Sequence, residues 1–545
     1  MNLLSKVSIP LMPLVGRITS KPASVYASVL HLRGQGVTAQ PHLTQDGDIL
    51  CWNGEIFEGL DVLPNENDGK KLFEALTRTE QPVDVLAQIE GPYAFVFYQK
   101  STNTLYYARD PLGRRSLLVH YPTAEQPHFI IASSCNGIST DFEFEEVTPD
   151  GIHCVKFNNI EEPETLVSNF KGATKLIGRV TEAASIMEYV LIPPLNNALP
   201  STEVREDWSS PSPSITQALE DFFNILNESV QLRVQHVPHQ YVQRFARVAV
   251  LFSGGIDCTV LAYLAHKHLP LSEPIDLLNV AFENPRTLKA ASKPSGKGKK
   301  VRPSSEAAEQ DVSEQGRSTY DVPDRLTGRE EAEELRRCCP ERTWNFVEIN
   351  VPYEECQRER PQVQNLMYPN QTVMDLSLAL ALFFASRGIG HVTNSDGIST
   401  PYTSQARVLL SGLGSDELLG GYSRHRKAFI RDKWQGLVEE LQLDLTRLPS
   451  RNLGRDDRVI SSNGKETRYP FLSLSVVSFL AKLPVETKIN PLLEEGKGDK
   501  MLLRMLAEKM GLVLASRRKK RAMQFGSRSA RMEGGDADRK GDAIL

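Results

Sequence analysis

RVAVLFSGGIDCTVLAYLAHKHL, Arg247 to Leu269, is the stretch that decides the fold of the second half of this 545-residue chain. Val248 to Phe252 form a continuous apolar run, which is typical of a strand buried on both faces. Adjacent glycines follow, and after them apolar residues recur at helical spacing. Strand, glycine turn and helix in this order make an α/β unit, so the sequence predicts a parallel sheet.

The glycine turn, Ser253 to Asp257 (SGGID), has the chemistry of a pyrophosphate site. Gly254 and Gly255 let the backbone approach an anion, and the helix that follows presents free N–H groups and a favourable dipole. The turn matches neither GxxxxGK[ST] nor GxGxxG. Taken alone it is also consistent with a simple helix cap, in which Ser253 or Asp257 serves the backbone.

A second polar loop, LLSGLGSDELLGG, runs from Leu409 to Gly421 and follows another apolar strand. If the two strands are parallel neighbours, Asp257 and Asp416 emerge at the same edge of the sheet, where such sheets bind ligands. Two carboxylates beside a triphosphate are what Mg²⁺ needs, so we expect Asp257 and Asp416 to hold the metal. Helix capping is the alternative, because acidic residues suit the first turn of any helix.

The first third of the chain has a different pattern. From Tyr26 to Phe157 short alternating strands are separated by turn signals, with one helical interruption at 69–78, which predicts a β-rich domain with a helical layer. The expected plan is a domain at 1–160, a linker at 161–215, an ATP-binding domain at 216–526 with a disordered surface insertion at about 285–325, and a flexible tail at 527–545. The polar stretch 391–405 also looks inserted.

Composition limits the function further. The net charge of −5 and the pI near 6.2 give no general attraction to nucleic acid or to acidic membranes, and no apolar run approaches a membrane span. The seven cysteines are scattered without the spacing of a zinc site. We therefore expect a cytoplasmic protein with small-molecule substrates and without nucleic-acid or membrane partners. The sequence sets no oligomeric state.

Longer motifs resemble a known family. SGGID, SGLGSDELLGGYSRHR, RYPFLSLSVVSFLAKLP and KKRAMQFGS resemble the synthetase half of the asparagine synthetases, whose ATP pyrophosphatase (PP-loop) domain has a parallel-sheet, adenine nucleotide α-hydrolase-like fold. LHLRGQGVTAQP, WNGEIF, GPYAFVFY and RDPLGRRSLL resemble a class II glutamine amidotransferase domain, a β-rich sandwich of N-terminal-nucleophile (Ntn) hydrolase type. The resemblance implies two domains, one α+β and one α/β.

The same resemblance implies roles for individual residues. Lys520 would stabilise the adenylated intermediate or the leaving pyrophosphate, and Glu417 would be a second catalytic residue. Without the resemblance, the run around Lys520 is a solvated basic surface and Asn53-Gly54-Glu55 is a hairpin turn. ATP would be bound by Leu251, Ser253, Gly254, Gly255, Asp257, Phe282, Ser411, Gly412 and Tyr422, and glutamine by Arg33, Asn53, Gly54 and Glu55. Leu251 and Phe282 fit an adenine pocket and a plain core equally well.

Two positions depart from the family pattern. Glutamine amidotransferases of this class use a cysteine at position 2 as nucleophile and its amine as base, and Asn2 stands there in this chain. Cys51 is the first cysteine, and we interpret it as a strand residue rather than a substitute nucleophile. Asparagine synthetases also have glutamate where this chain has Leu413, and leucine accepts no proton.

The predicted function is therefore an asparagine synthetase-like, AMP-forming ligase. With ATP and Mg²⁺ it would amidate aspartate through an acyl-adenylate, using nitrogen from ammonia or glutamine, and the sequence does not support the glutaminase step. One alternative is a nucleotide-binding pseudoenzyme or regulatory protein of the same family. Another is an ATP pyrophosphatase that acts on a different carboxylate.

Overall fold

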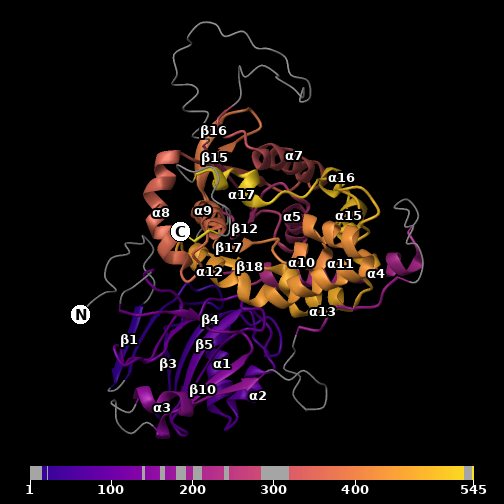
Figure 1. The fold of residues 1–545 in the computed structure, drawn as a ribbon. Coiled ribbons are helices and arrows are strands. Elements are labelled where there is room, and N and C mark those ends of the chain that lie inside the picture. Colours follow the sequence, from indigo (N-terminus) through magenta and orange to yellow (C-terminus); the bar gives the residue numbers. More distant parts are fainter. Residues whose placement is uncertain are drawn as a thin grey trace.

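The computed structural model describes residues 15–20, 23–137, 141–159, 166–178, 192–200, 211–238, 245–283, 318–532 and 543–544. These residues form two domains, with the N-terminal domain (indigo to violet) against the lower side of the C-terminal domain (magenta to yellow) in Figure 1. All seven cysteines lie within the described ranges and are free thiols. In the same ranges, no helix is long and apolar enough to span a bilayer.

The N-terminal domain is built on a six-stranded antiparallel sheet in the order β11-β10-β6-β5-β4-β3. Phe95 and Phe97 of β5 face helices α1 and α2. The alternate residues Ala94 and Val96 face the small sheet β8-β7-β9 and helix α3. This alternation confirms a β-rich domain with a helical layer. The elements are β1 (Val15–Ser20), β2 (Ala23–Ser28), β3 (His42–Leu43), β4 (Ile49–Gly54), α1 (Asp68–Thr77), α2 (Pro82–Leu86), β5 (Tyr93–Gln99), β6 (Thr104–Arg109), β7 (Leu118–His120), β8 (Ile130–Ala132), β9 (Glu145–Glu146), β10 (Gly151–Lys156), η1 (Phe157–Asn159), α3 (Leu166–Ala173) and β11 (Thr174–Gly178).

The C-terminal domain is built on a seven-stranded sheet in the order β16-β15-β14-β13-β12-β17-β18. Helices α4, α5, α7, α13 and α15 cover one face, and α8, α9 and α12 cover the other. The elements are α4 (Pro213–Val234), β12 (Val248–Leu251), α5 (Ile256–His268), β13 (Ile275–Phe282), α7 (Pro323–Cys338), β14 (Trp344–Val351), α8 (Tyr353–Met367), α9 (Val373–Arg387), β15 (Ile389–Thr393), β16 (Ser399–Thr403), β17 (Val408–Leu410), α10 (Ser415–Leu419), α11 (Ser423–Arg451), α12 (Leu453–Ser461), β18 (Glu466–Arg468), η3 (Pro470–Leu472), α13 (Leu474–Lys482), α14 (Val485–Lys488), α15 (Met501–Lys509), α16 (Val513–Ser516), α17 (Met523–Gly526) and η4 (Ser529–Arg531).

The pairing of β12 with β17 is the feature that positions the site. The two strands are parallel neighbours, with Val248 opposite Val408 and Val250 opposite Leu410. Both strands are fully buried, which agrees with their continuous apolar sequence. The prediction that the loops after these strands leave the same edge of the sheet is therefore confirmed.

The linker predicted at 161–215 is shorter than the sequence suggested. Residues 166–178 form α3 and β11, and β11 adds to the main sheet of the N-terminal domain with Gly178 opposite Gly151. At the other end, α4 begins at Pro213, and the Ser212 side chain caps it by accepting a hydrogen bond from the Ile215 amide. Proline at the first helical position and serine before it are helix-start signals, which correct our interpretation of this cluster as linker.

The insertion and the tail are also corrected at their edges. Residues 284–317 lie outside the described residues, but 318–325 belong to the folded domain, because α7 starts at Pro323 and Arg325 is fully buried. Stretch 391–405 contributes the hairpin β15–β16, which extends the sheet in antiparallel fashion. In the tail, Met532 is buried, and the carbonyl of Ser527 accepts a hydrogen bond from the Phe282 amide at 3.0 Å.

The two domains meet through buried charges. Arg115, 1% exposed, binds Asp457 at 3.2 Å and Glu466 at 2.6 Å, both of the C-terminal domain. The Ser116 amide donates to the same Asp457 at 2.9 Å. Glu146 of β9 likewise binds Arg458 of α12 at 2.7 Å. Since each of these charges is removed from water, the interface depends on all partners being present.

Replacing Arg115 with methionine should destabilise the protein by about 3–5 kcal/mol, because Asp457 and Glu466 then lose a buried counter-ion. The measurement is the urea midpoint followed by tryptophan fluorescence and by circular dichroism, since a two-domain chain need not unfold in one step. Arg431→Met is the matched control, because the Arg431–Asp432 pair is exposed to water and its loss should leave the urea midpoint nearly unchanged. Equal shifts in the two variants would contradict the interface.

Candidate functional site

Two glycine-rich loops face each other at the carboxyl edge of the C-terminal sheet. The first joins β12 to α5 and ends at Gly255, the residue that precedes α5. A side chain at Gly254, where φ is +75°, would overlap the backbone of α7, so the loop packs directly on that helix. The second loop follows β17, and its Gly412 lies against the Cβ of Asp257. The predicted phosphate loop and the predicted acidic loop are therefore in contact.

A cluster of two acids and two lysines lies between these loops, and the term charge cluster is used below for Asp257, Asp416, Lys500 and Lys520. The Lys500 ammonium, 1% exposed, is 2.7 Å from Asp257 Oδ2 and 2.7 Å from Asp416 Oδ1. It also donates to Ser415 Oγ at 3.0 Å. Lys520 binds the other oxygen of Asp416. Asp257, Asp416 and Lys520, all predicted site residues, are thus brought together.

The charges in the cluster stabilise one another. Burial alone would raise the pKa of the Asp416 carboxyl, but the ammonium groups of Lys500 and Lys520 outweigh burial and hold that pKa well below its usual range. Burial would likewise lower the pKa of Lys520, and the carboxylates of Asp416 and Asp257 raise it instead. Asp416 and Lys520 therefore both carry charge at neutral pH.

Close packing fixes the geometry of the cluster. A side chain at Gly421 would overlap both the Asp416 carboxylate and the Lys500 side chain. Lys500 itself has a left-handed backbone, with φ of 53°, directly before α15. Only glycine at 421 leaves room for the ammonium to reach both acids.

Glu417 and Tyr422 form a second, neighbouring pair. The Tyr422 hydroxyl donates to Glu417 Oε1 at 2.6 Å, and burial together with the nearby Asp416 carboxylate raises the pKa of Glu417. The Arg424 guanidinium lies 3.9 Å from the centre of the Tyr422 ring, and the Tyr422 amide donates to His425 Nδ1 at 3.2 Å. Glu417 is consequently a stronger proton acceptor than an ordinary carboxylate, and its partner is firmly held.

Leu413 lies in the same loop, between Ser411 and the acids. Its side chain is partly buried and packs against the apolar core of the domain. Its amide donates to Ser411 Oγ at 3.3 Å, and the Ser411 amide donates to the Arg468 carbonyl at 3.0 Å. Position 413 thus contributes apolar packing where the resemblance predicts a carboxylate.

A small pocket adjoins the predicted phosphate loop. Its lining includes the predicted residues Leu251 and Ser253, together with Asp324, which the sequence analysis did not identify. Phe282 is not part of this lining: it is fully buried and packs edge-on against Phe384 at 5.8 Å. Of the two residues proposed to flank adenine, Leu251 therefore lies in a pocket, and Phe282 lies in the core.

The residues fit a magnesium ion bound together with a triphosphate. Asp257 and Asp416 offer hard carboxylate oxygens on either side of one point, and Mg²⁺ in nucleotide sites takes one or two carboxylates plus phosphate oxygens and water. Within the described residues, no group of three or more acidic, histidine or cysteine side chains forms a metal site without such a partner. The Lys500 ammonium shares these carboxylates, so a metal ion would bind them beside it.

The predicted glutamine-binding residues lie in the N-terminal domain at the end of β4. Arg33 is 3.6 Å from Glu55, and Asp68 of α1 lies in the same buried acidic group, where its carboxylate accepts hydrogen bonds from the amides of Ile56 and Gly69 at 2.9 Å. Burial raises the pKa of Glu55 to about 8, although Arg468 opposes it. Burial also raises the pKa of the Cys51 thiol to about 11, so Cys51 carries no thiolate at neutral pH.

The hairpin alternative for Asn53-Gly54-Glu55 is wrong. Asn53 and Gly54 pair with Ala94 and Tyr93 inside the β4–β5 ladder, so no chain reversal occurs there. A side chain at Gly54 would overlap the carbonyl of Pro92 and the Tyr93 side chain, which explains the glycine. Asn53 is exposed within β4, and Glu55, which follows the strand, is buried.

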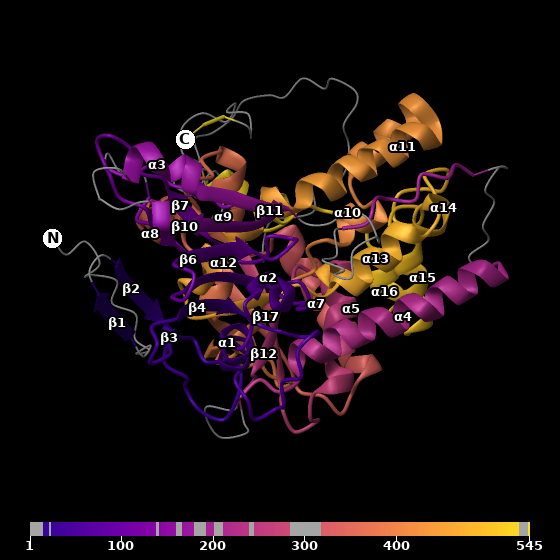
Figure 2. The same cartoon turned by 90° about the horizontal axis from the view of Figure 1, so that it is seen from below.

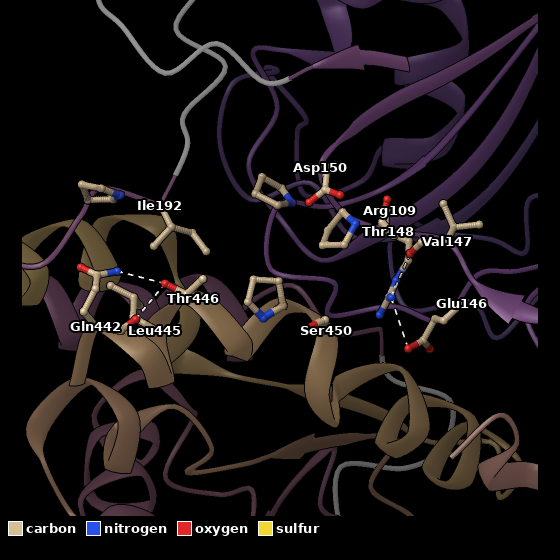
Figure 3. Close-up of a pocket in the computed structure, with 14 residues that line it drawn as sticks. Arg109, Glu146, Val147, Thr148, Asp150, Ile192, Gln442, Leu445, Thr446 and Ser450 are labelled. Atoms are coloured by element: carbon tan, nitrogen blue, oxygen red, sulfur yellow. Dashed lines mark hydrogen bonds and ion pairs between the residues drawn. The ribbon is translucent and has the colours of Figure 1, made fainter. Parts of the chain in front are cut away.

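A further pocket of about 520 Å³ lies between the domains and is lined by residues of both (Figure 3). Part of its polar lining is paired, since Arg109 binds Glu146 at 3.5 Å and Gln442 donates to Thr446 at 3.1 Å, and Asp150 also lines it. Prolines make up much of the remaining wall. We assign no ligand to this pocket.

Sequence reasoning missed Lys500, Asp68 and Arg468. Lys500 follows the loop sequence EEGKGD and carries no motif of its own. Asp68 starts a helix and resembles an ordinary first-turn acid. Arg468 carries no signal of its own beyond its place in the motif RYPFLSLSVVSFLAKLP. No spacing rule identifies these residues, because each acts on a partner that is distant in the sequence.

Comparisons with known proteins agree with both halves of this description. The family model described as "Asparagine synthase" matches residues 400–439 and 430–539, and the one described as "Glutamine amidotransferase domain" matches residues 30–140. The chain is 38% identical to asparagine synthetase domain-containing protein 1 of Bos taurus, over 93% of this chain and 88% of the relative. Asparagine synthetase domain-containing proteins of Saccharomyces cerevisiae and Drosophila melanogaster are 33% and 31% identical, over 96% and 92% of this chain and 86% and 88% of the relatives.

Lys500→Met should lower the free energy of unfolding by about 3–5 kcal/mol, because Asp257 and Asp416 lose their shared cation. Millimolar Mg²⁺ should then raise the thermal midpoint of this variant more than that of the wild type, since a divalent cation can replace the ammonium. Adding Asp257→Asn to Lys500→Met should abolish the gain. An equal Mg²⁺ effect on all three proteins would argue against a metal at these carboxylates.

Asp324→Asn should change the pH dependence of stability. Burial raises the pKa of the Asp324 carboxyl to about 7 against the opposing charges of Arg521 and Lys520. The native state then holds a proton that the unfolded state has released, so the wild type loses stability from about pH 4 to pH 7 and not above. The stability of Asp324→Asn relative to the wild type should therefore rise by about 1–3 kcal/mol between pH 5 and pH 8, measured by urea unfolding. A constant difference would contradict the assignment.

Proposed function

The chain belongs to the asparagine synthetase family, among its asparagine synthetase domain-containing proteins, and on this premise we propose that the C-terminal domain binds ATP and adenylates a carboxylic acid. Aspartate is the proposed acid. The observation that carries the proposal is the charge cluster beside the phosphate loop, where Lys500 and Lys520 lie with Asp257 and Asp416 at the amino end of α5.

The phosphate chain of ATP is proposed to lie on the loop from Ser253 to Gly255. The free N–H groups at the start of α5 favour anions, and glycine at 254 and 255 leaves the backbone accessible. Lys520, with a partly exposed side chain, supplies a fixed positive charge beside that loop. Leu251 in the adjoining small pocket is proposed to contact the adenine base.

In the first step an oxygen of the aspartate carboxylate attacks the α-phosphorus of ATP. The bond from that phosphorus to the bridging oxygen breaks, pyrophosphate leaves, and acyl-adenylate forms. Lys520 stabilises the charge that develops on the phosphate oxygens, a contact of the kind that is worth several kcal/mol in other enzymes. Mg²⁺, held by Asp257 and Asp416, would neutralise charge on the leaving pyrophosphate.

In the second step ammonia attacks the acyl carbon and AMP leaves. The attacking nitrogen must lose a proton, and Leu413 cannot accept it. We assign this role to Glu417, whose raised pKa makes it a better base than an ordinary carboxylate and whose carboxylate is oriented by Tyr422.

The N-terminal domain is proposed to bind glutamine. Cys51 is not proposed as a nucleophile that hydrolyses it. Arg33 suits the α-carboxylate and Glu55 suits the α-ammonium of an amino acid. Hydrolysis needs an activated nucleophile, and the Cys51 thiol is held protonated inside β4. Ammonia or glutamine is the proposed nitrogen source.

A second candidate is a nucleotide-binding regulatory protein that makes no amide. Leu413 favours it, because the loop lacks a carboxylate at position 413 and packs an apolar side chain against the core there instead. This candidate keeps the phosphate loop, the charge cluster and ATP binding, and it omits the second step.

The proposal is tested with purified protein, Mg·ATP, aspartate and ammonia, followed for pyrophosphate and asparagine. We expect aspartate-dependent pyrophosphate release, at least 100-fold lower in Lys520→Met. Lys519→Met is the control for the basic run, since Lys519 is exposed and outside the charge cluster. Leu413→Glu should raise the yield of asparagine per pyrophosphate if the amide step limits the wild type. Mg·ATP binding without pyrophosphate release would support the regulatory candidate.

A further inference from the structure

Arg468 bonds to both domains, through its main chain to one and through its side chain to the other. It is the last residue of β18, a three-residue strand at the edge of the sheet beside β17. Its carbonyl accepts a hydrogen bond from the Ser411 amide at 3.0 Å, and Leu410 is its partner in the ladder. The main chain of Arg468 therefore holds the first residue of the loop that carries Leu413 and Asp416.

The side chain of Arg468 points the other way, into the N-terminal domain. Its guanidinium is 1% exposed and lies 3.2 Å from Glu55 Oε1. The same group lies 5.6 Å from the centre of the Phe57 ring, two residues further along the chain. Within its own domain it donates to Glu466 at 2.7 Å and to the Arg233 carbonyl at 2.8 Å. Arg468 therefore bonds both to Glu55, at the end of β4, and to Ser411, in the loop after β17.

Glu55 is shared between two arginines. Its Oε2 lies 3.6 Å from Arg33, the residue assigned to the carboxylate of a bound amino acid, and its Oε1 faces Arg468. An ammonium group that binds Glu55 must compete with Arg468 for the same buried carboxyl group. Because β18 is short and has a neighbour on one side only, few main-chain bonds resist its displacement.

We propose that Arg468 is a positioning residue that couples amino-acid binding at Glu55 in the N-terminal domain to nucleotide affinity at the loop after β17. The coupling rests on the proposed function, because it needs an amino acid at Arg33 and Glu55 and ATP at the C-terminal site. The ligand ammonium weakens the Glu55–Arg468 pair, the guanidinium moves toward Glu466, and the strand carries the Ser411 amide with it. By linkage, ATP alters amino-acid affinity by the same factor.

Other interdomain ion pairs serve as an internal comparison. Glu146 binds Arg458 at 2.7 Å across the same interface, but Arg458 lies on α12 and bonds to Leu366, Met367 and Ser116 rather than to the nucleotide loop. Glu55→Gln and Glu146→Gln therefore make the same substitution on the N-terminal side of the same interface. Only Glu55→Gln should change the affinity for the nucleotide.

The test measures the dissociation constant of Mg·ATP by calorimetry in a double-mutant cycle. Glu55→Gln should change it by about 3- to 10-fold, within the usual range of coupling between sites. In the Arg468→Lys background the same substitution should change it less than about 1.5-fold, and Glu146→Gln should leave it within about 1.5-fold of the wild type. Equal effects of Glu55→Gln in both backgrounds, or equal effects of Glu55→Gln and Glu146→Gln, would overturn the coupling.

A ligand measurement separates this inference from the proposed function. Saturating L-glutamine should shift the Mg·ATP dissociation constant of the wild type by a similar factor and leave that of Arg468→Lys unchanged. If the wild type binds Mg·ATP but does not respond to L-glutamine, the coupling fails alone. If the wild type does not bind Mg·ATP, the proposed function fails and the coupling with it. Should Arg468→Lys not fold, the comparison of Glu55→Gln with Glu146→Gln and the response of the wild type to L-glutamine decide the inference.

Discussion

The ammonium group of Lys500 is the contact on which the C-terminal site depends. Asp257 follows β12 and Asp416 follows β17, and Lys500 precedes α15, so three separate parts of the chain meet at one buried charge. Two carboxylates at this distance would repel strongly in a low-dielectric interior without a cation between them. The position of Lys500 therefore fixes the distance between the two loops, and Gly421 provides the space for it.

The interface between the domains combines apolar packing of Leu32 and Leu112 with buried charges. Arg115, Arg458 and Arg468 are each about 1% exposed, and each has a carboxylate partner in the opposite domain or beside it. A buried pair of this kind adds little net stability compared with apolar packing, but it penalises every arrangement in which a partner is missing. Such an interface selects one relative position of the domains, which is what two sites that share Arg468 require.

Much of the site was visible in the sequence because it is local. SGGID is recognisable because its two adjacent glycines lie between an apolar strand and a helix. The acids of the second loop follow a strand in the same way. Their meeting could be anticipated, since parallel neighbours release their loops at one edge, and β12 and β17 are such neighbours. Lys500 could not be anticipated, because a lysine after a polar loop has no periodicity and its role comes from a left-handed backbone that only the surrounding packing imposes. The sequence also predicted the β-rich first domain. It did not predict β11, because the composition of that segment suggested a linker.

The sequence by itself determined the two domains, the glycine turn at 253–255, the acidic pair and the apolar residue at position 413, because these depend on residue type and short-range spacing. Only the tertiary structure decided that Asn53 and Gly54 lie inside a strand, that Phe282 belongs to the core, and that Glu55 faces an arginine of the other domain. The physical reason is the same in each case. Burial, pairing and pKa depend on which distant segments the fold brings within a few ångströms, and no local pattern encodes those distances.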